Sequence, residues 1–141
     1  MSVYSDLKNR CLKSNMEIKL NRLAIYTFGN VSIIDRKRKV IAIKPSGIPY
    51  DSLTEDKIVI LDLLGNIIEG DKRPSSDTKT HLYLYNAWKN INSICHTHST
   101  YAVGWSQSLY SIPVLGTTHA DHLTREIPCT QPMEDSLIKG D

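Results

Sequence analysis

The sequence predicts a single α/β domain in which helices cover a sheet. Apolar residues recur at helical spacing near 3–18 and over 78–88, whereas short apolar runs at 31–34, 40–43 and 58–61 are typical of buried strands. The chain of 141 residues is long enough for one hydrophobic core, and it contains no repeat, low-complexity tract or linker.

The first helix carries Val3, Leu7 and Cys11 on one face. The first two strands flank the basic run Arg36–Lys39. This arrangement predicts a hairpin with a solvated turn rather than a phosphate or nucleic-acid patch. A turn at Asp62–Asn66 then follows the third strand.

The second half of the chain continues the alternation of helix and strand. Leu82, Tyr85 and Trp88 recur at helical spacing. The next strand is expected within Ile94–Ser99, and a further helix is expected behind it at 101–108.

The composition is that of an ordinary soluble globular protein, with 40% hydrophobic and 23% charged residues. A net charge of +2 is too small to argue for a nucleic-acid partner. The three cysteines form no C-x-x-C pair, and we see no signal peptide or membrane span. We therefore expect a cytoplasmic protein without a membrane partner.

The segment Ile94–Ser99 contains two histidines one residue apart, His96 and His98. On an extended strand, residues i and i+2 point to the same face, with Cα atoms about 6.6 Å apart. Two imidazoles at this spacing can bind one zinc ion, whose nitrogen ligands lie at about 2.0–2.1 Å. The alternative is a strand with one buried and one surface histidine.

Three short polar clusters lie at expected turns, namely Gly29–Ser32, Lys44–Gly47 and Arg73–Asp77. Each combines backbone N–H groups with small hydroxyl or amide side chains, a combination that binds phosphate. The third cluster precedes the helix at 78–88, so the N–H groups of its first turn would face a bound anion. Ordinary turns and helix caps are the alternative for each cluster.

Two carboxylates could complete a metal site. Asp77 ends the third polar cluster, and Asp121 lies in the polar segment Thr117–His122. A carboxylate beside a divalent cation can bind it, orient its other ligands or transfer a proton. Either residue could equally be a helix cap or a surface charge.

These motifs, in this order, resemble those of the class II aldolase/epimerase family. The segments that carry the resemblance are Gly29–Ser32, Lys44–Gly47, Pro74–Asp77, His96–Ser99 and Gly116–Asp121. The resemblance extends over nearly the whole chain. It implies a class II aldolase-like three-layer α/β/α fold around a central, mostly antiparallel sheet. Residues 1–141 would form one such domain, incomplete at its C-terminal end.

The resemblance also implies roles for the site residues. It implies one zinc ion held by His96 and His98, with Asp77 as a further metal residue. It implies a sugar-phosphate substrate, bound by Gly29, Asn30, Lys44, Ser46, Gly47, Ser75 and Ser76. It implies that Asp121 donates and accepts a proton.

Within the family, the chain resembles the L-ribulose-5-phosphate 4-epimerases. Asp77 stands where similar aldolases of the fuculose- or rhamnulose-phosphate type carry Glu, and Thr118–Asp121 has no counterpart in them. A carboxylate shorter by one methylene lies far enough from the reaction centre to change its role. The implied reaction is zinc-dependent conversion of L-ribulose 5-phosphate to D-xylulose 5-phosphate at C4, by retro-aldol cleavage and re-addition. A sugar-phosphate aldolase is the alternative.

The family pattern continues beyond Asp141. In the family, a third zinc histidine and a C-terminal tyrosine lie further along, and His119 and His122 do not match the motif of that ligand. One expectation is therefore a fragment of a longer enzyme that forms a homotetramer when complete. The other is a truncated member without activity, comparable to the structural adducin heads, which resemble this fold but lack the metal histidines.

Overall fold

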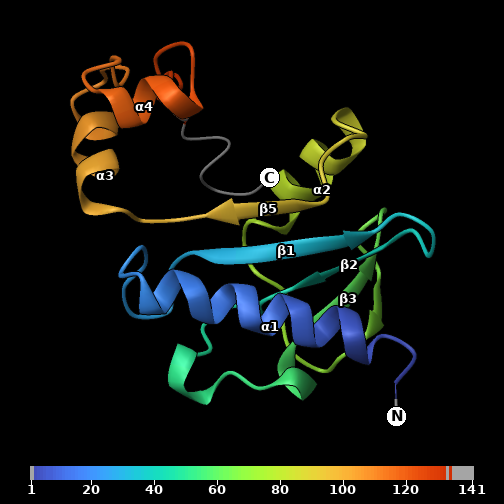
Figure 1. The fold of residues 1–141 in the computed structure, drawn as a ribbon. Coiled ribbons are helices and arrows are strands. Elements are labelled where there is room, and N and C mark those ends of the chain that lie inside the picture. Colours follow the sequence, from blue (N-terminus) through green and yellow to red (C-terminus); the bar gives the residue numbers. More distant parts are fainter. Residues whose placement is uncertain (1, 133, 135–141) are drawn as a thin grey trace. The chain divides into compact units, whose positions relative to one another are not determined.

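A computed structural model describes residues 2–132 and 134 of the chain (Figure 1). These residues belong to two units, Met1–His98 and Ser99–Asp141. The single domain expected from the sequence is neither confirmed nor contradicted by this division.

The first unit is built on a five-stranded sheet with the order β4-β3-β2-β1-β5. Every neighbouring pair of strands is antiparallel. The strands are β1 (Asn30–Asp35), β2 (Val40–Ile43), β3 (Val59–Asp62), β4 (Ile67–Glu69) and β5 (Ser93–His96). The helices are α1 (Ser5–Leu20) and α2 (Thr78–Ala87), and short 3-10 turns lie at Tyr50–Ser52 and Glu55–Lys57.

One face of the sheet is covered by α1 (Figure 1). Leu7, Cys11 and Ile18 of the helix are buried in one apolar cluster with Val31 and Ile33 of β1. Successive strand residues point to opposite faces, so the odd-numbered residues of β1 supply this cluster. Burial of aliphatic side chains of this size contributes about 1.5–3 kcal/mol each.

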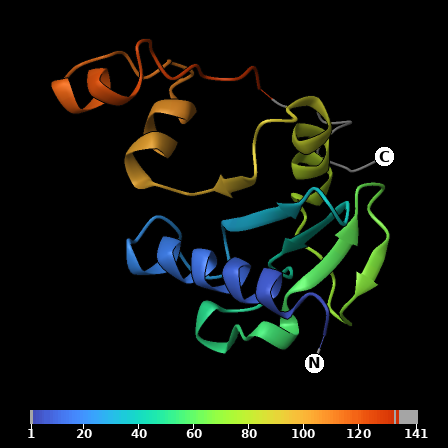
Figure 2. The same ribbon diagram turned by 45° about the vertical axis from the view of Figure 1, so that its right-hand side comes forward.

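The opposite face of the sheet is covered by α2 (Figure 2). Leu82 and Tyr85 of this helix pack against Ile34, Ile41 and Leu61 of the strands. The two helices therefore enclose the sheet between them. The expected three-layer α/β/α arrangement around an antiparallel sheet is confirmed.

Arg36 differs from the expectation of a solvated turn. The hairpin between β1 and β2 is confirmed, and Lys37–Lys39 are exposed. The Arg36 guanidinium, however, donates to the carbonyl oxygens of Tyr85 (3.1 Å), Trp88 (2.8 Å) and Ile91 (2.8 Å). The last carbonyls of a helix lack helical partners, so Arg36 closes the C-terminal end of α2.

The second unit contains α3 (Thr100–Gln107) and α4 (Thr117–His122). Ile112 and Ile127 exchange two backbone hydrogen bonds of 2.9 and 3.0 Å between extended segments. Helix α3 confirms the helix expected at 101–108. Helix α4 was not predicted, because its six residues carry no apolar periodicity.

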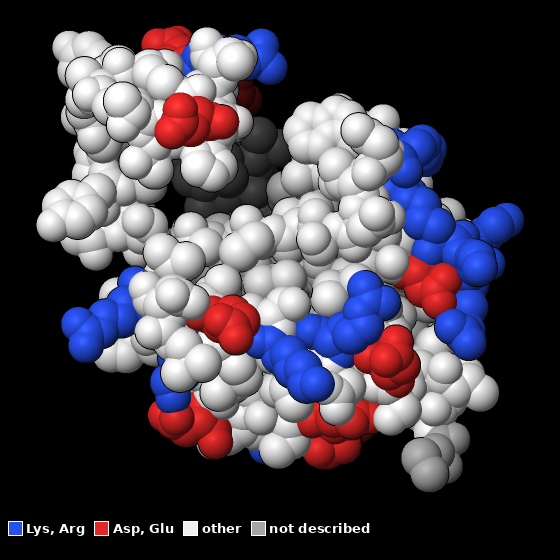
Figure 3. Space-filling view, viewed as in Figure 1, with Lys and Arg blue, Asp and Glu red and all other residues white. Residues whose placement is uncertain are grey.

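Basic and acidic side chains are interspersed over α1 and its surroundings on the face shown in Figure 3. This mixture agrees with the small net charge of +2. Within residues 2–132 and 134, no helix combines the length and apolar character needed to cross a membrane.

The capping role of Arg36 predicts a stability difference between two arginines of the same turn. Arg36→Lys should lower the free energy of unfolding by about 1–3 kcal/mol, because one ammonium cannot replace a fork that binds three carbonyls. Arg38→Lys is the matched control, since Arg38 is exposed and, among the described residues, forms an ion pair with Asp35 alone. It should change stability by less than about 0.5 kcal/mol. Equal effects in urea unfolding would contradict the assignment.

Candidate functional site

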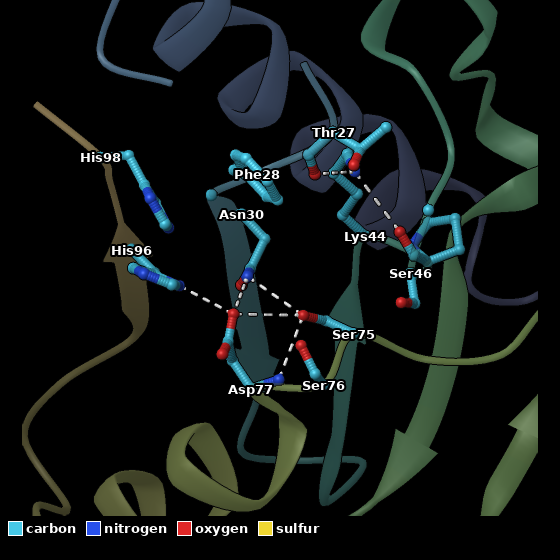
Figure 4. Close-up of a pocket in the computed structure, with 13 residues that line it drawn as sticks. Thr27, Phe28, Asn30, Lys44, Ser46, Ser75, Ser76, Asp77, His96 and His98 are labelled. Carbon is cyan, nitrogen blue, oxygen red and sulfur yellow. Dashed lines mark hydrogen bonds and ion pairs between the residues drawn. The ribbon is translucent and has the colours of Figure 1, made fainter. Parts of the chain in front are cut away.

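A cavity of about 370 Å³ opens at one end of the sheet (Figure 4). Four segments line it: the loop entering β1, the turn leaving β2, the segment before α2 and the end of β5. The lining residues are Thr27, Phe28, Gly29, Asn30, Lys44, Pro45, Ser46, Gly47, Ser75, Ser76, Asp77, His96 and His98. Every site residue expected from the sequence is therefore in one pocket, with the exception of Asp121.

Backbone pairing brings the four segments together. Asn30 pairs with His96 across β1 and β5. An isolated bridge joins Pro45 to Pro74, and the N–H of Ser46 donates to the carbonyl oxygen of Arg73 at 2.9 Å. The pocket is thus held by the sheet and its immediate extensions.

Gly29 has a structural role at the entrance to β1. Its φ of +69° favours glycine, and an added Cβ would lie 2.9 Å from both the Ala24 Cβ and the His96 carbonyl oxygen. The Tyr50 hydroxyl lies 3.0 Å from the carbonyl oxygens of Phe28 and Gly29. Close backbone approach therefore explains this glycine without any ligand.

Asp77 and His96 form the central contact of the pocket. The Nδ1–H of His96 donates to Oδ2 of Asp77 at 2.7 Å. The same oxygen accepts from the Asn30 side-chain amide at 2.6 Å and from the Ser75 hydroxyl at 3.3 Å. The hydrogen bond with His96 outweighs the opposing effect of burial and, together with the charge of His96 and the Asn30 hydrogen bond, lowers the pKa of Asp77 to about 2. The hydrogen bond with Asp77 raises the pKa of His96.

The two histidines of the H-x-H motif lie side by side, with ring centroids 4.9 Å apart and planes at 40°. The observed strand β5 ends at His96, so His98 lies beyond the strand on which it was expected. The His98 N–H instead donates to the Leu23 carbonyl oxygen at 2.8 Å. Phe28 stacks on the His98 ring at 5.3 Å. Contacts beyond the strand therefore keep the second imidazole beside the first.

The histidine pair fits part of a zinc site. Because Nδ1 of His96 is bound to a carboxylate, its Nε2 remains for a metal, as in the carboxylate–histidine–zinc arrangement. This geometry favours Asp77 as the residue that orients His96; direct ligation by Asp77 stays a prediction. Among residues 2–132 and 134, no group of three or more His, Cys, Asp or Glu side chains is arranged to hold an ion. His96 and His98 would therefore be two of the ligands.

Lys44 supplies a buried cation on the other side of the pocket. Its side chain is only 2% exposed, and its ammonium donates to the carbonyl oxygens of Thr27 (3.1 Å) and Pro45 (3.4 Å). It also lies 4.8 Å from the centre of the Tyr50 ring. Burial lowers the pKa of Lys44. No carboxylate forms an ion pair with it in the described part of the chain, so a bound anion would supply the missing charge.

Asn30 and Ser75 are already engaged with the protein. The Asn30 amide nitrogen donates to Asp77 and, at 3.1 Å, to the Ser75 hydroxyl. Its Oδ1 is buried without a hydrogen-bond partner among the described residues. The geometry favours Asn30 as a support for Asp77 and leaves the hydroxyls of Ser46 and Ser76, with Lys44, to face an anion.

A buried polar cluster beneath the pocket was not predicted. The Ser32 hydroxyl lies 2.7 Å from Nδ1 of His81 and 2.8 Å from the Tyr85 hydroxyl oxygen, and the Tyr85 O–H donates to the Ser32 carbonyl oxygen at 2.9 Å. Burial lowers the pKa of His81 to about 4. The cluster attaches α2 to β1 through His81, which lies four residues after Asp77 in the sequence. Helical spacing places His81 near Asp77, but nothing in the sequence indicates its partner on β1.

Sequence reasoning also missed Thr27, Phe28 and Pro45. Thr27 and Phe28 precede the cluster Gly29–Ser32 and Pro45 lies inside Lys44–Gly47, and this proximity was the only available signal. Asp121 lies on α4 in the second unit and is exposed. Its role as a proton donor and acceptor stays a prediction.

Comparisons with known proteins identify the family. Residues 9–140 match the sequence profile described as "Class II Aldolase and Adducin N-terminal domain". The chain belongs to this family.

Solved structures of this fold include an L-fuculose 1-phosphate aldolase with 34% identity and a TM-score of 0.74, matched over 81% of this chain and 53% of that one. L-Fuculose-1-phosphate aldolase from Thermus thermophilus has 24% identity and a TM-score of 0.73, over 90% and 64% of the chains. The L-fuculose 1-phosphate aldolase from Glaciozyma antarctica PI12 has 19% identity and a TM-score of 0.70, over 79% and 47%. The chain thus spans about half the length of the first of these.

The buried His81 predicts a specific pH dependence of stability. Its folded pKa of about 4 lies below the ordinary value of 6.5, so the unfolded chain binds more protons between these values. The stabilisation is present above pH 6.5 and is lost as the pH falls towards 4. His81→Asn retains a polar atom for Ser32 but does not titrate. Between pH 7 and 4.5, wild type should lose about 2 kcal/mol more unfolding free energy than this variant. Parallel urea-unfolding profiles would contradict the assignment.

Proposed function

We propose that the protein is a zinc-dependent sugar-phosphate 4-epimerase that interconverts L-ribulose 5-phosphate and D-xylulose 5-phosphate. The observation that carries the proposal is Asp77, a short carboxylate held by Asn30 and Ser75 and bonded to His96. The family supports sugar-phosphate chemistry at this pocket. Asp in place of Glu supports the epimerase branch.

The reaction divides the substrate between C3 and C4. When the C4 hydroxyl loses its proton, O4 forms the C=O of the aldehyde and the C3–C4 bond breaks. The electron pair of that bond moves onto C2 and C3, which become the enediolate of dihydroxyacetone. The other half leaves as glycolaldehyde phosphate, because the phosphate is on C5. Rotation of the aldehyde and re-addition to its opposite face restore the bond, return the proton to O4 and invert C4.

The residues of the pocket suit the two halves. Lys44, with Ser46 and Ser76, offers a cation and hydroxyl donors for the phosphate. Asp77 holds the tautomer and orientation of His96 on the other side. We assign proton transfer at O4 to Asp121, from the motif in which it lies. When bound, zinc supplies Lewis-acid polarisation of the carbonyl oxygen.

A class II sugar-phosphate aldolase is the second candidate function. The 34% identity to a structure described as L-fuculose 1-phosphate aldolase favours it. That substrate carries its phosphate on C1, so the same cleavage would give dihydroxyacetone phosphate and lactaldehyde. The two functions therefore differ in which half of the substrate carries the phosphate. A family member without catalytic activity is the third possibility, against which the retained His96 and His98 argue.

Zinc should bind through the histidine pair. Titration of the metal-free protein with zinc should show affinity at least about tenfold weaker in His96→Ala and in His98→Ala, because each removes a ligand. His122→Ala is the matched control; His122 is exposed and bonds the Thr118 carbonyl oxygen. Unchanged affinity in both pocket variants would remove zinc from this site.

The products distinguish the candidate functions. With zinc and L-ribulose 5-phosphate, the protein should form D-xylulose 5-phosphate and release little glycolaldehyde phosphate. With L-fuculose 1-phosphate, it should form dihydroxyacetone phosphate at least about a hundredfold more slowly, a difference of about 2.7 kcal/mol in barrier. The reverse preference would establish the aldolase, and no turnover of either substrate by the zinc-loaded protein would contradict both.

Asp77→Glu tests the residue on which this choice rests. A carboxylate longer by one methylene should crowd the rotating aldehyde, so released glycolaldehyde phosphate should rise about tenfold relative to D-xylulose 5-phosphate. Asp71→Glu is the matched control, since Asp71 is exposed in the preceding loop and pairs with Lys72. A fixed product ratio in Asp77→Glu would show that this carboxylate does not separate the two reactions.

A further inference from the structure

Asn15 of α1 makes an unusual contact with β1. Its side chain is fully buried, and its Oδ1 accepts from the backbone N–H of Val31 at 2.8 Å. Its Nδ2 donates to the Val31 carbonyl oxygen at 2.9 Å and to the Cys11 carbonyl oxygen at 2.8 Å. One side-chain amide thus satisfies both backbone groups of a strand residue.

The direction of the Val31 backbone N–H and C=O groups shows that the Asn15 amide replaces a residue of β2. Ile34 N–H donates to the Asn92 carbonyl oxygen, on the side of β5. Backbone groups of successive strand residues point to alternate neighbours, so those of Val31 point towards β2. The β1–β2 register pairs Ser32 with Ile43, and Lys44 would come opposite Val31 if it continued. Instead β2 ends at Ile43, and the Asn15 amide occupies the partner's position.

The end of this pairing is also where the pocket begins. Asn30, next to Val31, and Lys44, next to Ile43, both line the cavity. Beyond Ile43 the chain turns towards the segment before α2, where Pro45 bridges to Pro74. Continued pairing of Lys44 with Val31 would keep it in the sheet and away from that segment. Asn15 itself is not among the residues that line the cavity.

We propose that Asn15 is a positioning residue for the anion-binding half of the pocket. Its amide takes the place of a β2 residue opposite Val31, and this ends the β1–β2 ladder so that Lys44–Gly47 can turn to line the cavity. Without this amide, the Val31 N–H would lose its partner, and the Val31 carbonyl oxygen would keep only the weak Cys11 thiol donor at 3.4 Å. Pairing with Lys44 would satisfy them and close the pocket on the Lys44 side.

The native protein provides a test that needs no variant. The Val31 amide nitrogen should show a through-hydrogen-bond NMR coupling to the side-chain carbonyl carbon of Asn15, and the Asn15 side-chain amide protons should be protected from exchange. A coupling from Val31 to the carbonyl carbon of Lys44 would overturn the proposal. This readout requires neither substrate nor metal.

Asn15→Leu tests the consequence for the pocket. This variant keeps the volume but removes the amide, so a Val31–Lys44 backbone pair should appear in NMR spectra. Its affinity for inorganic phosphate should fall about tenfold. Leu7→Ala is the matched control, because Leu7 is buried on the same face of α1 and its truncation destabilises the core without removing a hydrogen bond to the Val31 backbone. Reduced stability in both variants with equal, unchanged phosphate affinity would reduce Asn15 to a structural role and overturn the proposal.

The substrate measurement rests on the proposed function. In Asn15→Leu, KM for L-ribulose 5-phosphate should rise about tenfold while kcat changes less than about threefold, because the residue acts on the phosphate segment and not on the reacting atoms. A lower kcat with unchanged KM would overturn the positioning role. If the native protein does not turn over this substrate, the proposed function fails, while the NMR and phosphate measurements still decide the role of Asn15.

Discussion

The hydrogen bond between Asp77 and His96 connects two elements on which the whole pocket depends. It joins residues 19 positions apart in the sequence, one at the start of α2 and one at the end of β5. Because α2 covers one face of the sheet, this contact fixes the first turn of the helix against the edge strand. Arg36 holds the opposite end of the same helix through three carbonyls. The position of the segment before α2, which we propose binds the anion, therefore follows from how the helix is held at both ends.

Much of the fold and of the pocket could be predicted because their signals are local. Apolar periodicity and turn residues identified the hairpin, α2 and α3, and the H-x-H spacing brought His96 and His98 together. The polar clusters were recognised by their small hydroxyl and amide side chains at turns, and residues of all three line one cavity. The two imidazoles are adjacent as predicted, but the reason differs from the prediction, since β5 ends before His98 and Phe28 stacks on its ring.

The contacts that could not be predicted share a different physical character. Asn15 bonds a backbone 16 residues away, Ser32 meets a histidine 49 residues away, and Arg36 reaches the end of a helix more than 40 residues on. Asn15 and Ser32 are buried and Arg36 is half-buried; the partners of all three are set by packing between elements, and no spacing rule connects them. A polar group that packing removes from water needs a hydrogen-bond partner in the protein, so these contacts fix how α1 and α2 lie on the sheet. Sequence patterns thus located the pocket, while these contacts determine its geometry.

The arrangement of the pocket also bears on how one fold can support either release or retention of a cleaved aldehyde. With a C1 phosphate, cleavage leaves the phosphate on the enediolate half, so both ends of the cavity hold the same fragment and the aldehyde is free to depart. With a C5 phosphate, the aldehyde half carries the phosphate.

In that case, the segment around Lys44 would hold the aldehyde fragment, and the histidine side of the pocket would hold the enediolate fragment. Retention with rotation requires this division, because the aldehyde must turn without leaving before the bond re-forms. A buried lysine with no carboxylate partner among the described residues suits a phosphate that must stay bound through that step. The physical requirement of the proposed epimerisation is therefore an anchor for the second fragment, and we propose that the separation of Lys44 from β1 makes room for it.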